Sequence, residues 1–273
     1  MTDASDPTQP PDAQVEYKKW LKTIESTDEL NGGGPILAPI FQQLLAGKKF
    51  NTAFEWCAGP AWIGMWLLEN NICETLVTGD INEKTAKLVS KTAKKHNYDV
   101  RAYVSFNLKN IPKKEQFDLV ISNPPNYCNI QRSHTHGYMR DDLRPSDVDW
   151  EIHEDFYNNI SNYLNDDAVL FISEVEPYNR EVHVFDELFD KRAELPIDAF
   201  NRMTTNNDLT ITKIIPYSLE DAYNNLMSTD DSIDTHCYIL EIHKQETPSP
   251  QRQHPSRGRG SGDHQPRQTP RPR

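Results

Sequence analysis

Short β-rich runs alternate with amphipathic helical stretches along the middle of this chain, and this alternation limits the possible folds more than any other feature. Strands are predicted at 52–56, 74–79, 100–105, 117–122, 168–173, 208–215 and 236–243, and helices at 14–30, 36–46, 61–70, 83–95, 151–164, 181–193 and about 219–227. Strands that alternate with helices form parallel, doubly wound sheets with right-handed crossovers. We therefore predict an α/β fold with its ligand at the carboxyl ends of the strands.

The two ends of the chain differ in composition from the middle. Residues 1–12 and 248–273 hold nine of the nineteen prolines and few apolar residues, and such segments cannot bury a core. We predict that both are disordered. Between them, 13–46 is predicted to be a helical extension, broken at the triple glycine 32–34 and with Pro39 in the first turn of its second helix. Residues 47–247 then form the α/β domain.

Charge is distributed unevenly along the chain. The segment 248–273 carries six arginines and one acid, a net charge of +5, so the remainder must carry −17 to give the total of −12. An acidic body repels polyanions, and nucleic acid would have to enter through a locally basic face. The basic tail, with RGRG at 257–260, is predicted either to contact nucleic acid or only to keep the protein in solution.

Several classes of protein are disfavoured by the sequence. The longest apolar run, 61–68, is too short to span a bilayer, and the N-terminus has no apolar signal segment. The four cysteines form no CxxC pair, which argues against a zinc ribbon or a disulfide framework and favours the cytoplasm. His134 and His136, with Asp141 and Asp142, lie in a polar loop and are predicted to be solvated, so no metal site is predicted.

The residues that follow the first two strands of the α/β domain suit a cofactor. From Glu55 the chain runs into the small-residue turn Cys57-Ala58-Gly59-Pro60-Ala61, whose backbone N–H groups can approach a ligand closely. A plain strand-to-helix turn is the alternative. Asp80 ends the second strand, where a carboxylate can accept hydrogen bonds from both ribose hydroxyls or can cap a helix. Together, the turn and the acid indicate a cofactor that contains a nucleoside.

A second motif follows the strand 117–122, which leads directly into Asn123-Pro124-Pro125-Asn126. The two prolines fix the backbone and remove two N–H donors. The amide oxygen of Asn123 and an outward proline carbonyl would then be two acceptors for one planar NH2 group, which aims its nitrogen at an electrophile. A plain Asn-Pro turn is the alternative interpretation.

On these residues the sequence resembles class I S-adenosylmethionine-dependent methyltransferases of the Asn/Asp-Pro-Pro-Tyr/Phe type, which methylate adenine, guanine or glutamine-amide nitrogens. The resemblance extends from Phe50 to Lys244. It implies a seven-stranded, mostly parallel, Rossmann-like methyltransferase sheet closed by the antiparallel hairpin 208–215 and 236–243, and S-adenosyl-L-methionine as the cofactor. It also implies a methyl-acceptor site with Asn123, Pro124, Pro125 and Asn126 as its catalytic segment, and a cofactor site made by Glu55, Cys57, Ala58, Gly59, Asp80, Ile81, Phe106, Asn107 and Asn123.

In that site the turn would hold the methionine part of the cofactor and Asp80 the ribose, but three positions depart from the family pattern. Cys57 and Ala61 replace two of the three glycines of the turn, and cofactor binding survives this change if these positions keep a negative φ. Phe106 stands where an acid often follows the third strand, and we expect its ring to stack on the adenine while Asn107 bonds the adenine amine. Asn126 replaces the aromatic residue that stacks on a planar substrate.

The predicted function is methyl transfer from S-adenosylmethionine to a nitrogen of a nucleobase or protein side chain, by direct in-line displacement. A small-molecule methyltransferase and a non-catalytic scaffold subunit with the same fold are the alternatives. An NAD-dependent oxidoreductase would share the turn and the ribose acid, but it gives no reason for Asn-Pro-Pro. The long loop 128–149 is predicted to be a lid or a substrate-binding segment.

Overall fold

The computed structural model describes residues 11–27, 34–126, 147, 150–177, 196–217 and 235–245. The helices in this part of the chain are α1 (Pro11–Leu21), α2 (Gly34–Leu44), α3 (Trp62–Glu69), α4 (Glu83–His96), α5 (Glu151–Ile160), the 3-10 turn η4 (Ser161–Tyr163) and α7 (Pro196–Thr205). The strands are β1 (Phe50–Trp56), β2 (Cys73–Asp80), β3 (Val100–Val104), β4 (Phe117–Ser122), β5 (Leu164–Pro177), β6 (Leu209–Tyr217) and β7 (Thr235–Lys244).

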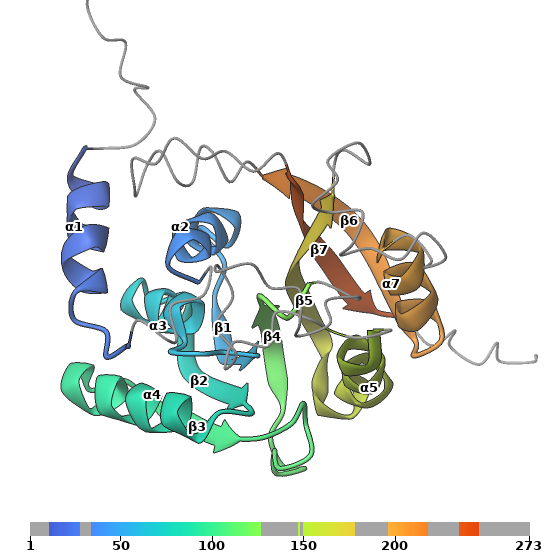
Figure 1. The fold of residues 1–273 in the computed structure, drawn as a ribbon, viewed down its shortest axis with the longest axis horizontal. Coiled ribbons are helices and arrows are strands. Elements are labelled where there is room, and N and C mark those ends of the chain that lie inside the picture. Colours follow the sequence, from blue (N-terminus) through green and yellow to red (C-terminus); the bar gives the residue numbers. More distant parts are fainter. Residues whose placement is uncertain are drawn as a thin grey trace, which may run out of the picture.

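The strands form a seven-stranded sheet in the order β3-β2-β1-β4-β5-β7-β6 (Figure 1). Strands β1 to β5 are parallel to one another, and β7 runs antiparallel to both β5 and β6. The predicted α/β fold, with a mostly parallel sheet and a closing antiparallel hairpin, is confirmed. Its strand order reverses between β1 and β4, which is where such sheets bind ligands.

Two hydrophobic cores lie on opposite faces of the sheet because alternate side chains of a strand point to opposite sides. Ala53 of β1 packs in the core beneath α2, α3 and α4, whereas its neighbour Phe54 packs in the core beneath α5 and α7. Figure 1 shows these two groups of helices on either side of the sheet. Helix α1 lies outside α3, where the rings of Tyr17 and Trp20 pack at a tilt against Trp66.

Helix α2 contains a proline in its interior, and α1 compensates for it. Pro39 was predicted to lie in the first turn of this helix. It lies in the interior instead, because the helix already begins at Gly34. A proline nitrogen has no hydrogen to donate, so the carbonyl of Pro35 lacks its usual helical partner. The hydroxyl of Tyr17 donates to that carbonyl instead. This bond attaches α1 to the start of α2.

Other boundaries also differ from the prediction. Helix α1 begins at Pro11, inside the segment 1–12 that was predicted to be disordered, because proline is well suited to the first position of a helix. It also ends at Leu21, well before residue 30. Strand β5 starts at Leu164, where a helix was predicted to end, and α7 was not predicted at all.

The predicted helices 181–193 and about 219–227 lie outside the described residues, as does the basic tail 248–273. In the parts of the chain that the structure does describe, no helix is both long enough and apolar enough to cross a membrane.

Gly64 of α3 lies too close to β2 to accept a side chain. A Cβ atom at this position would lie 2.6 Å from Oε2 of Glu55 and against the side chain of Leu76. We expect Gly64→Ala to lower the free energy of unfolding by about 3 kcal/mol, the upper part of the usual range for overpacking. Denaturant unfolding measures this loss.

Gly47→Ala is the matched control, because a Cβ at Gly47 meets nothing within 4 Å and only the positive φ of 78° opposes it. That variant should lose about 1 kcal/mol. Equal losses in both variants would contradict the close packing inferred at Gly64.

Candidate active site

The carboxyl ends of β2, β1 and β4 lie side by side at the same level. Trp56, the last residue of β1, pairs with Gly79 on one side and with Ser122 on the other. The hydroxyl of Ser122 also donates to the carbonyl of Trp56 at 2.6 Å. The sheet therefore brings together the turn 57–61, Asp80 and Asn123, which the sequence placed in one site.

The turn after β1 has a left-handed backbone at three of its positions. Cys57 has a φ of 54°, Gly59 of 50° and Ala61 of 61°. The expectation that Cys57 and Ala61 keep a negative φ is therefore wrong. The chain reverses within this turn, where the N–H of Ala61 donates to the carbonyl of Ala58 at 2.7 Å. The turn keeps this backbone path without the usual glycines, although each non-glycine residue in this conformation costs about 1–2 kcal/mol.

The thiol of Cys57 is not poised as a nucleophile. Burial, together with the carboxylates of Asp80, Asp147 and Glu174, raises its pKa well above the ordinary value. A thiol with a raised pKa stays protonated at neutral pH and is a poor nucleophile. Cys57 is thus a small packing residue of the turn.

The side chain of Glu55 is hydrogen-bonded to the backbone of the protein. Its carboxylate is buried and accepts a hydrogen bond from the backbone N–H of Gly64 at 2.8 Å. Burial raises the pKa of this carboxyl to about 8, although the amides of Gly64 and Ile63 oppose the rise. Glu55 therefore anchors the first turn of α3, and its predicted contact with the methionine part of a cofactor stays a prediction.

Asp80 lies beside open space at the end of β2. One carboxylate oxygen accepts from the N–H of Gly59 and the other from the N–H of Asn82, both at 2.8 Å. A Cβ atom added at Gly59 would meet no atom of the described residues within 4 Å. Each carboxylate oxygen has a further lone pair, so the two amides hold Asp80 in place and leave it able to accept from a diol.

The residues predicted to hold an adenine ring fall into two groups. Ile81 is 52% exposed and Phe106 is half-buried, so both offer apolar surface near Asp80. The amide of Asn107 is buried and already bonded, because it accepts from Trp56 Nε1 at 2.9 Å and donates to Ile152 O and Asp155 Oδ2 at 2.9 and 2.7 Å. This side chain links β1 to α5, which leaves Ile81 and Phe106 as the surface for a base.

One carbonyl of the acceptor motif already has a partner within the motif. Nδ2 of Asn126 donates to the carbonyl of Pro124 at 2.9 Å, which uses one of the two lone pairs of that oxygen. Asn126 is 8% exposed, and its Oδ1 has no partner among the described residues. The acceptor oxygens of this segment include the side-chain oxygens of Asn123, which is half-buried, and of Asn126.

A buried histidine between two carboxylates was missed by the sequence analysis. His153 of α5 contacts Asp147 through Nδ1 at 2.5 Å and Glu174 of β5 through Nε2 at 3.1 Å, and all three side chains are fully buried. Burial disfavours the charged imidazolium, but the two carboxylates outweigh it and raise the pKa of His153 to about 9. The group is an acid–histidine–acid triad with a protonated centre at neutral pH.

This triad adjoins the turn after β1, since the ring of His153 packs edge-on against Trp56 at 5.2 Å between centroids. One part of it had a sequence signal. Asp147 accepts from the backbone N–H groups of Ile152 and His153 at 2.7 and 3.0 Å. Trp150 occupies the N-cap position, but an acid within a few residues before a helix can still bond its first free N–H groups. The position of Glu174, one residue beyond the predicted strand 168–173, gave no such signal.

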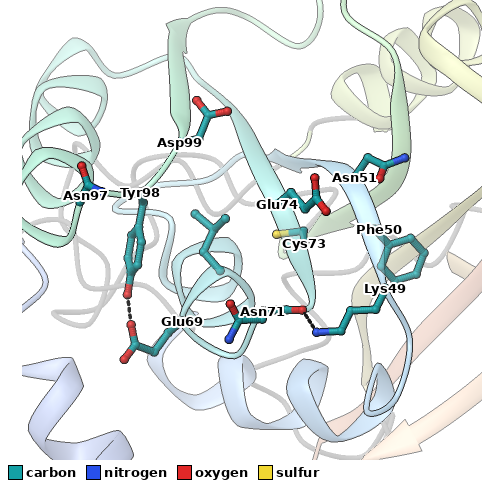
Figure 2. Close-up of a pocket in the computed structure, with 11 residues that line it drawn as sticks. Lys49, Phe50, Asn51, Glu69, Asn71, Cys73, Glu74, Asn97, Tyr98 and Asp99 are labelled. Atoms are coloured by element: carbon teal, nitrogen blue, oxygen red, sulfur yellow. Dashed lines mark hydrogen bonds between the residues drawn. The ribbon is translucent and has the colours of Figure 1, made fainter.

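A pocket of about 650 Å³ opens at the opposite edge of the sheet, near the amino ends of β1 and β2 (Figure 2). Figure 2 shows Cys73 and Glu74 on one strand of this pocket and Tyr98 bonded to Glu69 at its side. None of the predicted site residues lines it. The predicted site and this pocket are therefore separate places in the fold.

Metal binding has no support in the described part of the chain, where no group of three or more His, Cys, Asp or Glu side chains could hold an ion. The loop histidines His134 and His136, with Asp141 and Asp142, lie outside the described residues. So does the rest of the loop 128–149, apart from Asp147.

Comparison with protein families gives a match where the site residues lie. Residues 21–136 match the family model described as the methyltransferase small domain. The matched residues include the turn after β1, Asp80 and Asn123–Asn126. The match supports the predicted enzyme class, a methyltransferase. It covers less than half of the chain. A search of curated proteins gave no match.

Solved structures similar to this methyltransferase fold have low sequence identity. They include ribosomal protein L11 methylase from Lactobacillus delbrueckii subsp. bulgaricus, with 12% identity, 77% of each chain covered and a TM-score of 0.45. TrmK from M. capricolum with S-adenosyl-homocysteine has 12% identity, 77% of this chain and 69% of its own covered, and a TM-score of 0.48.

A third is the 16S rRNA N2 G1207 methyltransferase RsmC from T. thermophilus with AdoMet and guanosine, with 12% identity, 81% of this chain covered and a TM-score of 0.45. This chain spans only 45% of that protein. At this level of similarity, these proteins do not indicate the methyl acceptor of this chain.

Proposed function

We propose that this protein transfers a methyl group from S-adenosylmethionine to the nitrogen of a planar amine or amide, in a nucleobase or a protein side chain. The pairing of Trp56 with both Gly79 and Ser122 carries the proposal. This register puts the candidate cofactor turn, the candidate ribose acid and Asn123 at one level of the sheet, as an in-line transfer between two bound molecules requires.

The cofactor fits the residues that border the open side of the sheet. Asp80 would accept from the two ribose hydroxyls, and Ile81 with Phe106 would contact the adenine. The open space at Gly59 would admit the chain that leads to the sulfur. S-adenosylmethionine supplies a methyl group on a positively charged sulfur, which makes the methyl carbon electrophilic, so the protein has mainly to bind and align.

The acceptor segment suits an NH2 group. Asn123 and Asn126 offer two amide oxygens, and an NH2 group has two hydrogens to donate. Bonds to both oxygens would hold the nitrogen with its lone pair toward the methyl carbon. The nitrogen becomes positively charged during transfer, and the carboxylates of Asp80, Asp147 and Glu174, which together raise the pKa of Cys57, make this edge of the sheet favourable to that charge.

The test is incubation of the full chain with methyl-labelled S-adenosylmethionine and separated RNA, DNA, protein and small-molecule fractions of a cell extract. Label in nucleic acid or protein supports the proposal, and hydrolysis of the labelled polymer shows whether a nitrogen carries it. Label only in the small-molecule fraction supports the first alternative. Binding of S-adenosylhomocysteine without any transfer supports a scaffold.

Asp80 should be needed for cofactor binding. We expect Asp80→Ala to weaken S-adenosylhomocysteine binding by about 2–4 kcal/mol, because two hydrogen bonds to a charged oxygen are lost. Titration calorimetry measures the affinity, and circular dichroism shows whether the variant is folded.

Asp99→Ala is the control for this measurement. Asp99 is an exposed acid at the opposite edge of the sheet, where its carboxylate accepts from the hydroxyl of Thr75 at 2.8 Å. It should leave the affinity unchanged. A folded Asp80→Ala variant with wild-type affinity would exclude Asp80 from the cofactor site.

A further inference from the structure

Helix α2 brings its first residues to the same edge of the sheet as the candidate cofactor turn. Only five residues connect Leu44, at the end of α2, to Phe50, at the start of β1. The helix must therefore run opposite to the strand, and its N-terminus lies at the carboxyl end of β1. The contact with α3 agrees, because a Cβ atom at Gly34 would lie 2.8 Å from Cδ1 of Trp62.

The indole of Trp62 presents a buried donor at this position. Trp62 is 6% exposed, and its Nε1–H has no acceptor in the part of the chain that the structure describes. Cδ1, the ring carbon bonded to Nε1, is the atom nearest to Gly34. One turn further along α3, Trp66 donates from Nε1 to Gln42 at 2.7 Å. An unpaired buried donor costs about 1–3 kcal/mol. The indole N–H of Trp62 should therefore have an acceptor, as that of Trp66 does.

The partner should be an anion. The first backbone N–H groups of a helix have no acceptor within it, and they carry the positive end of the helix dipole. At the start of α3, the carboxylate of Glu55 already uses such a group, the N–H of Gly64. The start of α2 is the neighbouring helix N-terminus. No Lys or Arg occurs from Trp56 to Ile63, so an anion at this turn would depend on backbone and indole N–H groups.

We propose that Nε1–H of Trp62 and the N-terminus of α2 together bind a carboxylate, the α-carboxylate of the methionine part of S-adenosylmethionine. The proposal rests on the proposed function and adds the groups that recognise this end of the cofactor. Trp62 directly follows Ala61, the last residue of the turn expected to hold the methionine part. Gly34 is then required for its size, because a side chain there would displace the indole that donates.

The test compares two ligands that differ only in the carboxylate, S-adenosylmethionine and decarboxylated S-adenosylmethionine, by titration calorimetry. The wild-type protein should bind S-adenosylmethionine at least tenfold more tightly. Trp62→Phe, which removes the N–H and keeps a ring, should lower its affinity about tenfold or more, the scale of one hydrogen bond to a charged group. Affinity for the decarboxylated ligand should change little.

Trp66→Phe is the matched control, because it removes an indole N–H from the same helix whose acceptor is Gln42. It should leave the ratio of the two affinities at the wild-type value. Equal affinities of wild-type protein for the two ligands would overturn the carboxylate subsite, even if Trp62→Phe failed to fold. A folded Trp62→Phe variant with an unchanged ratio would overturn the role of Trp62. If wild-type protein bound neither ligand, the proposed function would fail together with the subsite.

Discussion

Replacement of Asn123 by alanine is expected to slow methyl transfer by roughly two to four orders of magnitude, the scale for losing a group that positions the transition state. The side-chain oxygen of Asn123 would hold one hydrogen of the acceptor nitrogen, and alanine offers no substitute. Because Ser122 fixes β4 to β1 through the carbonyl of Trp56, the fold and much of the affinity for S-adenosylhomocysteine should remain. The rate of label transfer and calorimetry measure the two effects separately.

Two further variants make this prediction specific. Asn123→Asp keeps an acceptor oxygen in the same place, so appreciable transfer should remain. Asn165→Ala removes an asparagine at the amino end of β5, which donates to Asp118 at 2.6 Å, and should leave transfer unchanged. If Asn123→Ala transfers methyl groups as fast as wild type, the acceptor site lies elsewhere. A scaffold would show no transfer in wild type or in any variant.

The sheet and the location of the site could be predicted from the sequence because both depend on local patterns. Alternation of apolar strands and amphipathic helices determines a parallel sheet, and a parallel sheet brings the carboxyl ends of its strands to one edge. Asp80 and Asn123 could therefore be placed at the same edge without any knowledge of their contacts. The structure confirms this placement through the paired residues Trp56, Gly79 and Ser122.

Features that depend on contacts distant in sequence could not be predicted. The interior Pro39 of α2 is accommodated by a hydroxyl from α1, and no pattern within α2 shows this. The left-handed φ of Cys57 and Ala61 follows from the path of the turn, whereas the residue types alone favour negative φ. The bond from Asn126 to the carbonyl of Pro124 depends on a side-chain rotamer. In each case the surroundings of the residue, and not its local sequence, determine the conformation.

The triad of Asp147, His153 and Glu174 was missed for a related reason. A single histidine on the apolar face of a helix is usually a core residue with a hydrogen bond, and nothing local distinguishes His153 from that case. Its charge depends on two carboxylates, one before the helix and one on β5, which the fold brings to 2.5 and 3.1 Å. Burying such a group without partners costs several kcal/mol, so the triad should have a measurable effect on stability.

We expect the free energy of unfolding to fall by a few kcal/mol as the pH rises from about 6.5 to 9, and His153→Gln to make this slope clearly smaller, most of all between pH 8 and 9. The pKa of His153 is raised from 6.5 to about 9 in the folded protein. Below the lower value both states bind the proton, and the stabilisation is complete. Between the two values only the folded state keeps the proton, so stability declines with pH, and above about 9 the contribution is lost.

Glu55 also contributes to the decline below about pH 8, because burial raises its pKa to about 8, so His153 is measured by the difference in slope between wild type and His153→Gln. Burial raises the pKa of Tyr157 and of Cys57 well above their ordinary values, so neither loses a proton in this range. His243→Gln is the control, because that histidine is 40% exposed and pairs with Glu241 at 2.9 Å on the surface, where such pairs contribute little. Urea unfolding at several pH values measures the slope. Equal slopes in wild type and His153→Gln would show that His153 is not the protonated centre of the triad.

Asp147 holds the start of α5, and Glu174 lies just beyond the level of Asn123 on the neighbouring strand. Loss of the proton from His153 should therefore also change the acceptor site. His153 is a positioning residue in this view, since it acts through the two carboxylates and contacts neither cofactor nor substrate. The rate of methyl transfer in wild type should then fall over the same pH range as stability. In His153→Gln the rate should be lower at neutral pH and nearly independent of pH up to 9, whereas a purely structural role would leave the pH profile of the folded variant like that of wild type.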